Sequence, residues 1–128
     1  MFIRFVIADR DGDSGRRQGL FQAGDMLRES GRMSDADIGR LDELERWFRE
    51  HLAVPDRFSL SSKANRKAQA ISWFRDSAHE QIGRMRDYQA LLESYEIPVQ
   101  MLREKRPGYV VYEDEHQVVA YPFSETRC

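Results

Sequence analysis

The sequence is short of cysteine and of long apolar runs, and each shortage excludes a class of protein. The single cysteine, Cys128, cannot form an internal disulfide or a cysteine-ligated zinc site, so no disulfide framework is expected. No apolar segment approaches the roughly 18 residues of a membrane span. The first residues also lack the features of a signal peptide. We therefore expect a soluble cytoplasmic protein without a membrane segment.

An excess of charge of one sign is absent as well. Charged residues make up 33% of the chain, but the formal net charge is only -2. The chain therefore lacks the global basic field that is typical of nucleic-acid-binding proteins. A length of 128 residues fits one compact domain. We expect a single globular domain over residues 1–123 and a frayed tail at residues 124–128.

Familiar catalytic signatures are missing too. The sequence contains no P-loop, no glycine-rich dinucleotide motif, no nucleophile elbow, no HExxH and no paired CxxC. The three histidines, His51, His79 and His116, are far apart in the sequence, and only the fold could bring them together. These absences favour binding or regulation over catalysis.

Hydrophobic periodicity predicts an α+β domain. Residues 1–8 alternate like a strand, residues 16–30 have helical periodicity, and Ser34 with Asp37 predicts the start of a second helix. Further strands are predicted at residues 67–74, 97–103, 109–113 and 117–121, and a third helix at residues 75–95. The order β-α-α-β-α-β-β-β indicates an α+β (α/β-like) two-layer sandwich with a mixed sheet of about five strands and about three helices. The alternative is one long helix over residues 67–95, which would leave a mostly helical domain.

The segment "FRDSAHE" at residues 74–80 lies inside a predicted strand-helix-strand unit, whose strands would be parallel. Ser77 and Glu80 predict a capping box for the helix. Arg75, Ser77 and His79 would surround an anion at the helix N-terminus, and His79 could act as a general acid or base. An ordinary helix cap explains the same residue types without a ligand.

The loop "DRDGDSG" at residues 9–15 places acids at alternate positions. Asp9, Asp11 and Asp13 match the first three acidic positions of an EF-hand loop. Ser14 and Leu20 occupy the positions that require glycine and glutamate, so an EF-hand is excluded. The loop also has the composition of an ordinary turn, which needs no ligand.

An acid that ends a first strand can still hold magnesium. Asp9 ends the run "FVIAD", Asp11 follows it, and Arg16 and Arg17 come next. This opening resembles the start of the Cas2 and VapD nuclease families. The resemblance implies a ferredoxin-like fold, Asp9 as a catalytic magnesium ligand, and Arg16 and Arg17 as phosphate contacts.

The two candidate loops would form one site under a specific condition. If the first strand runs parallel to the strands of the strand-helix-strand unit, Asp9 and Arg75 emerge at the same end of the sheet. Arg16 and Arg17 would then lie near the bound anion. The acids of the loop could equally well neutralise these two arginines.

The C-terminal segment "YVVYEDEHQVVAYPF" is apolar on both faces of its two predicted strands. Tyr109, Val111, Tyr112 and Val119 are the predicted interface for a protein partner or a second copy of the chain, unless a helix of the same chain covers them. A basic strip could contact nucleic acid or be an ordinary solvated face, because acids are mixed into it. Its members are Lys63, Arg66, Lys67, Arg84, Arg86, Arg103, Lys105 and Arg106.

Two functions follow from these observations. The first is a small binding or regulatory protein of bacterial type, acting through a protein or nucleic-acid partner, with no cofactor and with a homodimer as one form. The alternative is a phosphate-binding protein or a metal-dependent, nuclease-like enzyme with its site at the carboxyl ends of the strands. In that case Mg²⁺ would bind Asp9 and Asp11, and His79 would serve as acid or base.

Overall fold

The computed structural model describes residues 1–12, 14–55 and 69–128, and these residues form three helices and one six-stranded sheet. The helices are α1 (Leu20–Glu29), α2 (Asp35–His51) and α4 (His79–Glu93). The strands are β1 (Phe2–Arg10), β2 (Arg17–Gly19), β3 (Ile71–Arg75), β4 (Gln100–Glu104), β5 (Tyr109–Glu113) and β6 (Gln117–Tyr121). The predicted α+β sandwich and the order of its elements are confirmed, with the short β2 added.

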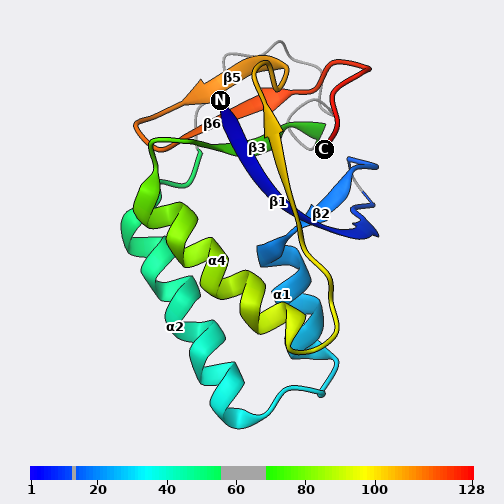
Figure 1. Cartoon of the computed structure of the whole chain (residues 1–128), viewed down its shortest axis with the longest axis vertical. Helices are drawn as coiled ribbons and strands as arrows, with labels where there is room; N and C mark the ends of the chain where they lie inside the picture. Colours follow the sequence, from blue (N-terminus) through cyan, green and yellow to red (C-terminus); the bar gives the residue numbers. More distant parts are fainter. Residues whose placement is uncertain (13, 56–68) are drawn as a thin grey trace.

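The helices form one layer below the sheet in the view of Figure 1. Successive side chains of a strand point to opposite faces, so Ile3, Phe5 and Ile7 of β1 pack in the helix-side core. Val6 and Trp73 belong to a second apolar cluster. Because β1 contributes to both clusters, it is an inner strand, as its apolar run predicted.

The sheet order is β2-β1-β3-β6-β5, with β4 also paired to β1, and all these pairings are antiparallel. Phe2 and Ile3 pair with both β3 and β4, so β1 lies between these two strands. β3 and β4 therefore run in the same direction but do not touch as a parallel pair. The unit is a split β-α-β. The periodicity of the sequence could not show that β1 lies between β3 and β4 in the sheet.

The first helix begins at Leu20 and not at residue 16. Arg17 instead lies in β2, opposite Arg10 of β1. Both Arg16 and Arg17 are therefore outside the helix, and neither opposes its dipole in the first turn. The expected local conflict between two arginines and a helix N-terminus does not exist.

The other two helices differ in how they start. Ser34 caps α2 by accepting a hydrogen bond from the Asp37 backbone N–H at 3.2 Å, as predicted. The capping box predicted for Ser77 and Glu80 is wrong, because Ala78 is the N-cap of α4 and no side chain caps it. The alternative of one long helix through residues 67–95 is also wrong, because β3 occupies part of this segment.

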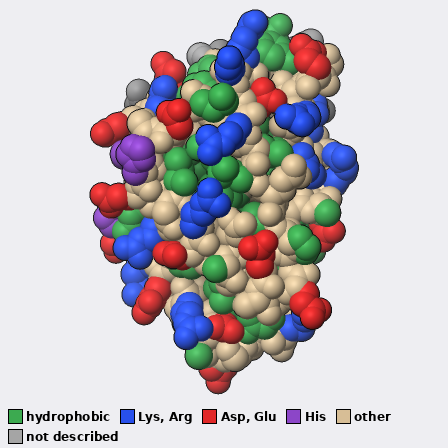
Figure 2. Space-filling view, viewed as in Figure 1, with side chains coloured by type: hydrophobic (Ala, Val, Ile, Leu, Met, Phe, Trp, Pro, Cys, Tyr) green, Lys and Arg blue, Asp and Glu red, His purple; other side chains and the backbone are tan. Residues whose placement is uncertain are grey.

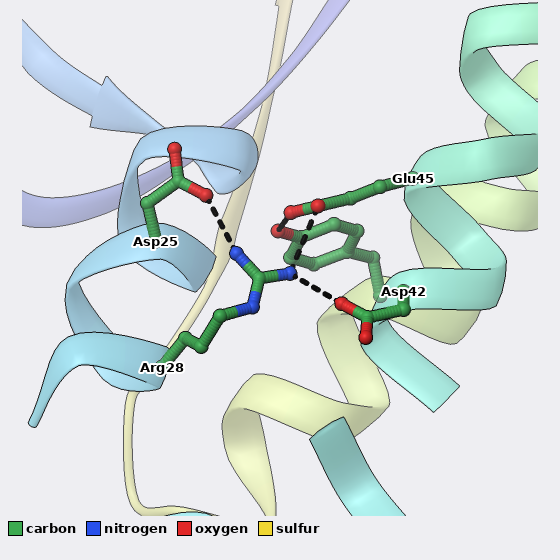
Figure 3. A network of polar contacts seen from close by, with 5 residues as sticks. Asp25, Arg28, Asp42 and Glu45 are labelled. Carbon is green, nitrogen blue, oxygen red and sulfur yellow. Dashed lines mark hydrogen bonds and ion pairs between the residues drawn. The ribbon is translucent and has the colours of Figure 1, made fainter. Parts of the chain in front are cut away.

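An ion-pair network joins α1 to α2 (Figure 3). Arg28 of α1 binds the carboxylates of Asp25 at 3.0 Å, Asp42 at 2.9 Å and Glu45 at 2.9 Å. The Tyr88 hydroxyl of α4 donates to Glu45 at 3.4 Å. The network thus connects all three helices with one cation and three carboxylates.

The last residues pack against the domain, although a frayed tail was expected. Thr126 is 6% exposed and Cys128 is 5% exposed. The Thr126 N–H donates to the Phe123 carbonyl at 3.1 Å, and Cys128 joins the second apolar cluster. Burial of these side chains, which their position in the sequence did not indicate, holds this segment in place.

Some predictions fall outside the described residues. They concern Asp13, most of the loop after α2, and Lys63, Arg66 and Lys67 of the basic strip. Within the described part of the chain, none of the helices combines the length and the apolar character that a membrane span needs.

Candidate functional site

The two loops predicted to share a site lie toward opposite ends of β1. Arg75 pairs with Phe2 near the start of this strand, whereas Asp9 lies near its end. β1 and β3 are antiparallel, so the condition that would bring the loops together is not met. The predicted single site at the strand ends therefore does not form.

The acids and arginines of the first loop make structural contacts, some within the loop and some to other elements. The Asp11 carboxylate accepts from the Ser14 backbone N–H and from the Gln22 amide, both at 3.0 Å. Arg16 donates to the Thr126 carbonyl at 3.5 Å, and Arg17 donates to the Gln100 amide oxygen at 2.6 Å. The contact between Asp11 and Ser14 is that of a turn that joins two strands, whereas the two arginines bind the loop to the C-terminal segment and to β4.

Metal ligands do not gather in the residues that the structure describes. Asp9 is exposed, and no group of three histidine, cysteine or acidic side chains within residues 1–12, 14–55 and 69–128 could hold a metal ion. The predicted magnesium site on Asp9 and Asp11 thus has no third histidine, cysteine or acidic ligand from this part of the chain.

The three histidines, by contrast, lie around one hollow of the surface. His51 at the end of α2, His79 at the start of α4 and His116 between β5 and β6 line one hollow of about 630 Å³ with Ser77. Figure 2 shows histidine side chains at the left margin of this face, among acidic and basic side chains. Arg75, predicted to join Ser77 and His79, instead donates to the Asp114 carbonyl at 2.9 Å. We call this surface the histidine hollow.

Two of these histidines already have partners. His51 stacks on the Trp47 ring, with ring centroids 4.3 Å apart, and its Nδ1 lies 2.8 Å from the Trp47 carbonyl oxygen. His116 lies 3.8 Å from the Glu115 carboxylate. His79 is exposed at the surface. The hollow is therefore an open polar surface with its histidines spread around it.

The predicted interface is divided between core and surface. Val111 and Val119 are each 3% exposed and lie inside the domain, and the Tyr112 hydroxyl donates to Asp114 at 2.8 Å. Tyr109 and its neighbour Val110 remain 63% and 44% exposed. β6 lies between β3 and β5, and its residues 117–120 are buried on both faces.

A second cavity lies between the sheet and the helices, and we call it the sheet–helix pocket. Its volume is about 450 Å³. Apolar side chains supply most of its wall: Phe5, Leu20, Phe21, Phe48, Phe74 and Met85. Arg4 and Trp73 also line it, although Trp73 belongs to the apolar cluster on the other side of the sheet. The lining residues of the pocket therefore come from both faces of the sheet.

Sheet topology explains how one pocket reaches both faces. β1 and β3 pair only at Phe2 and Ile3, opposite Arg75 and Phe74. Beyond these residues β3 continues to pair with β6, while Val6 of β1 pairs with β2 and β4. The pocket lies where β1 and β3 separate, next to Arg4.

Two buried donor groups of residues beside this pocket have no acceptor. Among the described residues, the buried side-chain atoms without a hydrogen-bond partner are Arg4 Nε, Trp73 Nε1, Gln18 Oε1 and Gln89 Oε1. An amide oxygen can exchange places with its nitrogen by a flip, but arginine and indole N–H groups only donate. Arg4 and Trp73 are both lining residues of the sheet–helix pocket, but these two nitrogen atoms are enclosed by the protein. Buried polar groups are almost always paired, so the two enclosed donors are exceptions.

The charge of Arg4 is unpaired as well. Its side chain is 9% exposed, and no ion pair joins it to another described residue. Its one hydrogen bond within the described chain is from Nη2 to the Arg17 carbonyl. Burial lowers the pKa of Arg4 to about 10 although the charges of Cys128 and Asp11 act in the opposite direction, so the guanidinium still carries its proton at neutral pH. A buried charge is costly unless it is paired.

Sequence reasoning did not select Arg4 or Trp73. The signal for Arg4 was present, because it is a single cation inside the apolar run "MFIRFVIA" of an inner strand. No local signal distinguished Trp73, since a tryptophan in a strand is ordinary core. No protein-family model, curated protein or solved structure matches the chain. The nuclease resemblance therefore rests on Asp9, Arg16 and Arg17 alone.

Proposed function

We propose that the protein binds a small organic molecule with an apolar body in the sheet–helix pocket, and that it acts by binding and not by catalysis. The observation that carries this proposal is the wall of the pocket, in which apolar side chains predominate and a few polar residues, such as Ser72 and Gln117, are interspersed. Ligand pockets have this composition, with apolar walls and a few placed polar groups.

The size and contents of the pocket support binding. A volume of about 450 Å³ lies within the range of about 300–1,000 Å³ that is usual for small-molecule sites. The acids on its wall, Asp25 and Glu45, already bind Arg28. No histidine or cysteine is among the described lining residues. A general base, nucleophile or proton shuttle therefore has no obvious candidate in this pocket.

The experiment uses the indole N–H resonances of the two tryptophans in a ¹⁵N-labelled protein. Trp47→Phe assigns the two peaks. 2-Naphthol and 2-naphthoate serve as apolar probes of suitable size. We expect saturable movement of the Trp73 indole peak, because Trp73 is a lining residue of the pocket, while the peak of Trp47, which is not among the lining residues, stays in place. Absence of a saturable change with both probes at millimolar concentration would contradict the proposal.

Self-association is a second proposal, supported by the exposure of Tyr109 and Val110 on β5. Exposed apolar side chains next to each other are typical of contact surfaces. Light scattering of the wild type and of Tyr109→Lys tests it. A dimer that the substitution converts to a monomer would support a second copy as the partner, and a wild-type monomer would rule it out. Nucleic acid has weaker support, because acidic and basic side chains are intermixed in Figure 2.

A further inference from the structure

Ser72 of β3 lies on the face of the sheet that the sheet–helix pocket occupies. Trp73 pairs with Val118 of β6, and both belong to the apolar cluster on the other side of the sheet. Side chains alternate along a strand, so Ser72 and Phe74 face the helices, where Phe74 packs in the core. Ser72 lines the pocket and is exposed, although Ile71 and Trp73 on either side of it are buried. An inner strand thus presents an accessible serine to the pocket.

The Ser72 hydroxyl is free to bind a ligand. Its side chain has no hydrogen-bond partner among the described residues. The other polar groups of the wall are less available, because the Gln117 amide donates to the Ala53 carbonyl at 2.6 Å and the unpaired nitrogens of Arg4 and Trp73 are enclosed. A hydroxyl both donates and accepts hydrogen bonds. Ser72 can therefore pair with a hydroxyl or a carbonyl group.

The charged side chains of the pocket wall balance one another. Arg4 and Arg49 are positive, and Asp25 and Glu45 are negative. Both acids also bind Arg28 in the network of Figure 3. The wall therefore carries no net charge that a ligand would have to neutralise. An ion that enters an apolar pocket without a partner loses its hydration at a high cost.

The position of Arg4 supports the same conclusion. Arg4 pairs with Leu102 of β4, which belongs to the apolar cluster on the other side of the sheet, so the Arg4 side chain starts on that face. Burial lowers the pKa of Arg4, whereas the charges of Cys128 and Asp11 act in the opposite direction. Negative charge is thus already close to this guanidinium, and Arg4 is not an anchor for an anion in the pocket.

Aromatic rings supply much of the wall on the helix side. The Phe21 and Phe48 rings meet edge to face, with centroids 5.1 Å apart, and the Phe48 and Phe74 rings are tilted, with centroids 6.4 Å apart. Aromatic pairs in such arrangements gain energy beyond the burial of their area. A ligand ring against this array would gain contacts of the same kind, which a saturated ring of similar size lacks.

We propose that the ligand of the sheet–helix pocket is an uncharged aromatic compound with one hydroxyl or carbonyl group, which forms a hydrogen bond with the Ser72 hydroxyl. This inference rests on the proposed function and specifies its ligand class. The phenylalanines of the wall provide the ring contacts, β3 provides the polar contact, and the balanced charge of the wall disfavours ions.

The experiment compares four probes by titration at pH 7, with the Trp73 indole resonance as the readout. The probes are 2-naphthol, 2-naphthoate, 2-naphthylmethylammonium and decahydro-2-naphthol. We expect uncharged 2-naphthol to bind about tenfold or more tightly than either ion, because each ion loses hydration without gaining a partner. It should also bind about two- to tenfold more tightly than the saturated alcohol, which lacks the aromatic contacts.

Two substitutions test the polar contact. Ser72→Ala removes the hydroxyl and should lower the affinity for 2-naphthol about two- to tenfold, the effect of one hydrogen bond. Ser72→Thr keeps a hydroxyl and should retain most of this affinity. Ser124→Ala is the matched control, because Ser124 is exposed and is not a lining residue of the pocket. It should leave all four affinities unchanged.

The outcomes separate this inference from the proposed function. Binding of either ion, or of the saturated alcohol, as tightly as 2-naphthol overturns the inference and leaves small-molecule binding intact. Unchanged affinity of Ser72→Ala, or an equal loss in Ser72→Thr, also overturns it. Failure of every probe to move the Trp73 resonance removes the proposed function itself. If a Ser72 variant does not fold, the probe series on the wild type still decides the ligand class.

Discussion

Two arginines in this domain have contrasting surroundings. Arg28, in the helix layer, has a side chain 29% exposed and three carboxylate partners. Arg4, in the sheet, is 9% exposed and pairs with no acid among the described residues. The cation that water could partly solvate has three carboxylate partners, whereas the buried one has a single hydrogen bond within the described residues, to the Arg17 carbonyl. Arg28 thus stabilises the packing of the helices, whereas the buried charge of Arg4 is expected to destabilise the fold.

The largest effect is expected where the Arg28 network meets α4. In Gly24→Ala, the new Cβ would lie 1.9 Å from the Tyr88 hydroxyl oxygen and 2.8 Å from its ring. Tyr88 is fully buried, so it can move only by disturbing its bond to Glu45. We expect a loss of about 3 kcal/mol in the free energy of unfolding, measured in urea.

Gly39→Ala is the matched control for Gly24→Ala. Gly39 lies in α2 and a Cβ there would meet nothing within 4 Å. Alanine is the better helix former, so this variant should gain about 0.5–1 kcal/mol. If both substitutions change stability in the same direction, the close approach of α1 to Tyr88 is not what determines the first effect.

The second effect tests Arg28 directly. Arg28→Met leaves Asp25, Asp42 and Glu45 close together without their shared cation. The Glu45 side chain is only 18% exposed, so solvent compensates it incompletely. We expect a loss of about 2 kcal/mol in the free energy of unfolding at neutral pH. The loss should shrink in acid as the carboxylates take up protons, and an equal loss at all pH values would indicate lost packing instead.

The third prediction is a gain, and not a loss, in the free energy of unfolding. Arg4→Met removes an unpaired buried charge and one hydrogen bond to the Arg17 carbonyl, and it keeps an apolar side chain of similar length. Without ligand, we expect the variant to be about 1 kcal/mol more stable than the wild type in urea unfolding. A loss comparable to that of Arg28→Met would show that both arginines are structural, and the contrast between them would disappear.

The smallest change in stability is expected at Asp114, whose carboxylate accepts several hydrogen bonds. Burial alone would raise the pKa of Asp114, but hydrogen bonds from the His116 N–H, the Tyr112 hydroxyl and Gln117 outweigh it and lower the pKa. A carboxyl whose pKa is lowered by folding stabilises the protein above its unfolded pKa, and this contribution disappears as the pH falls through the folded pKa.

Asp114→Asn should therefore cost about 1 kcal/mol or less at neutral pH, and the difference from the wild type should close below about pH 4. Urea unfolding at several pH values measures it. A difference that does not change with pH would mean that the carboxylate charge is not what Asp114 contributes. Gln117, which donates a hydrogen bond to Asp114, is also a lining residue of the sheet–helix pocket, so Asp114 contacts the wall of that pocket through Gln117.

Much of the fold followed from local patterns. The two strands predicted at residues 109–113 and 117–121 have these bounds in the structure, and Ser34 caps α2. The candidate site followed less well. Ser77 and His79 do share a hollow, but Arg75 turns to the Asp114 carbonyl, and Asp9 lies toward the far end of β1. The predictions failed where they depended on which strands are neighbours.

The misplacement of Arg16 and Arg17 has a similar cause. Their position before an apolar helical stripe predicted a helix start, but pairing of Arg17 with Arg10 draws the chain into β2. A backbone pairing partner supplied by an earlier strand outweighs a modest helix propensity.

The sequence alone determined the three helices and every strand of the described sheet except β2, the inner position of β1 and the presence of one arginine within its apolar run. Periodicity, helix caps and strand composition act between near neighbours, so they can be read along the chain. Only the tertiary structure decided that β1 separates β3 from β4, that three distant histidines line one hollow, and that Arg4 and Trp73 share a pocket. Those features depend on pairing between segments far apart in the sequence, which local patterns do not encode.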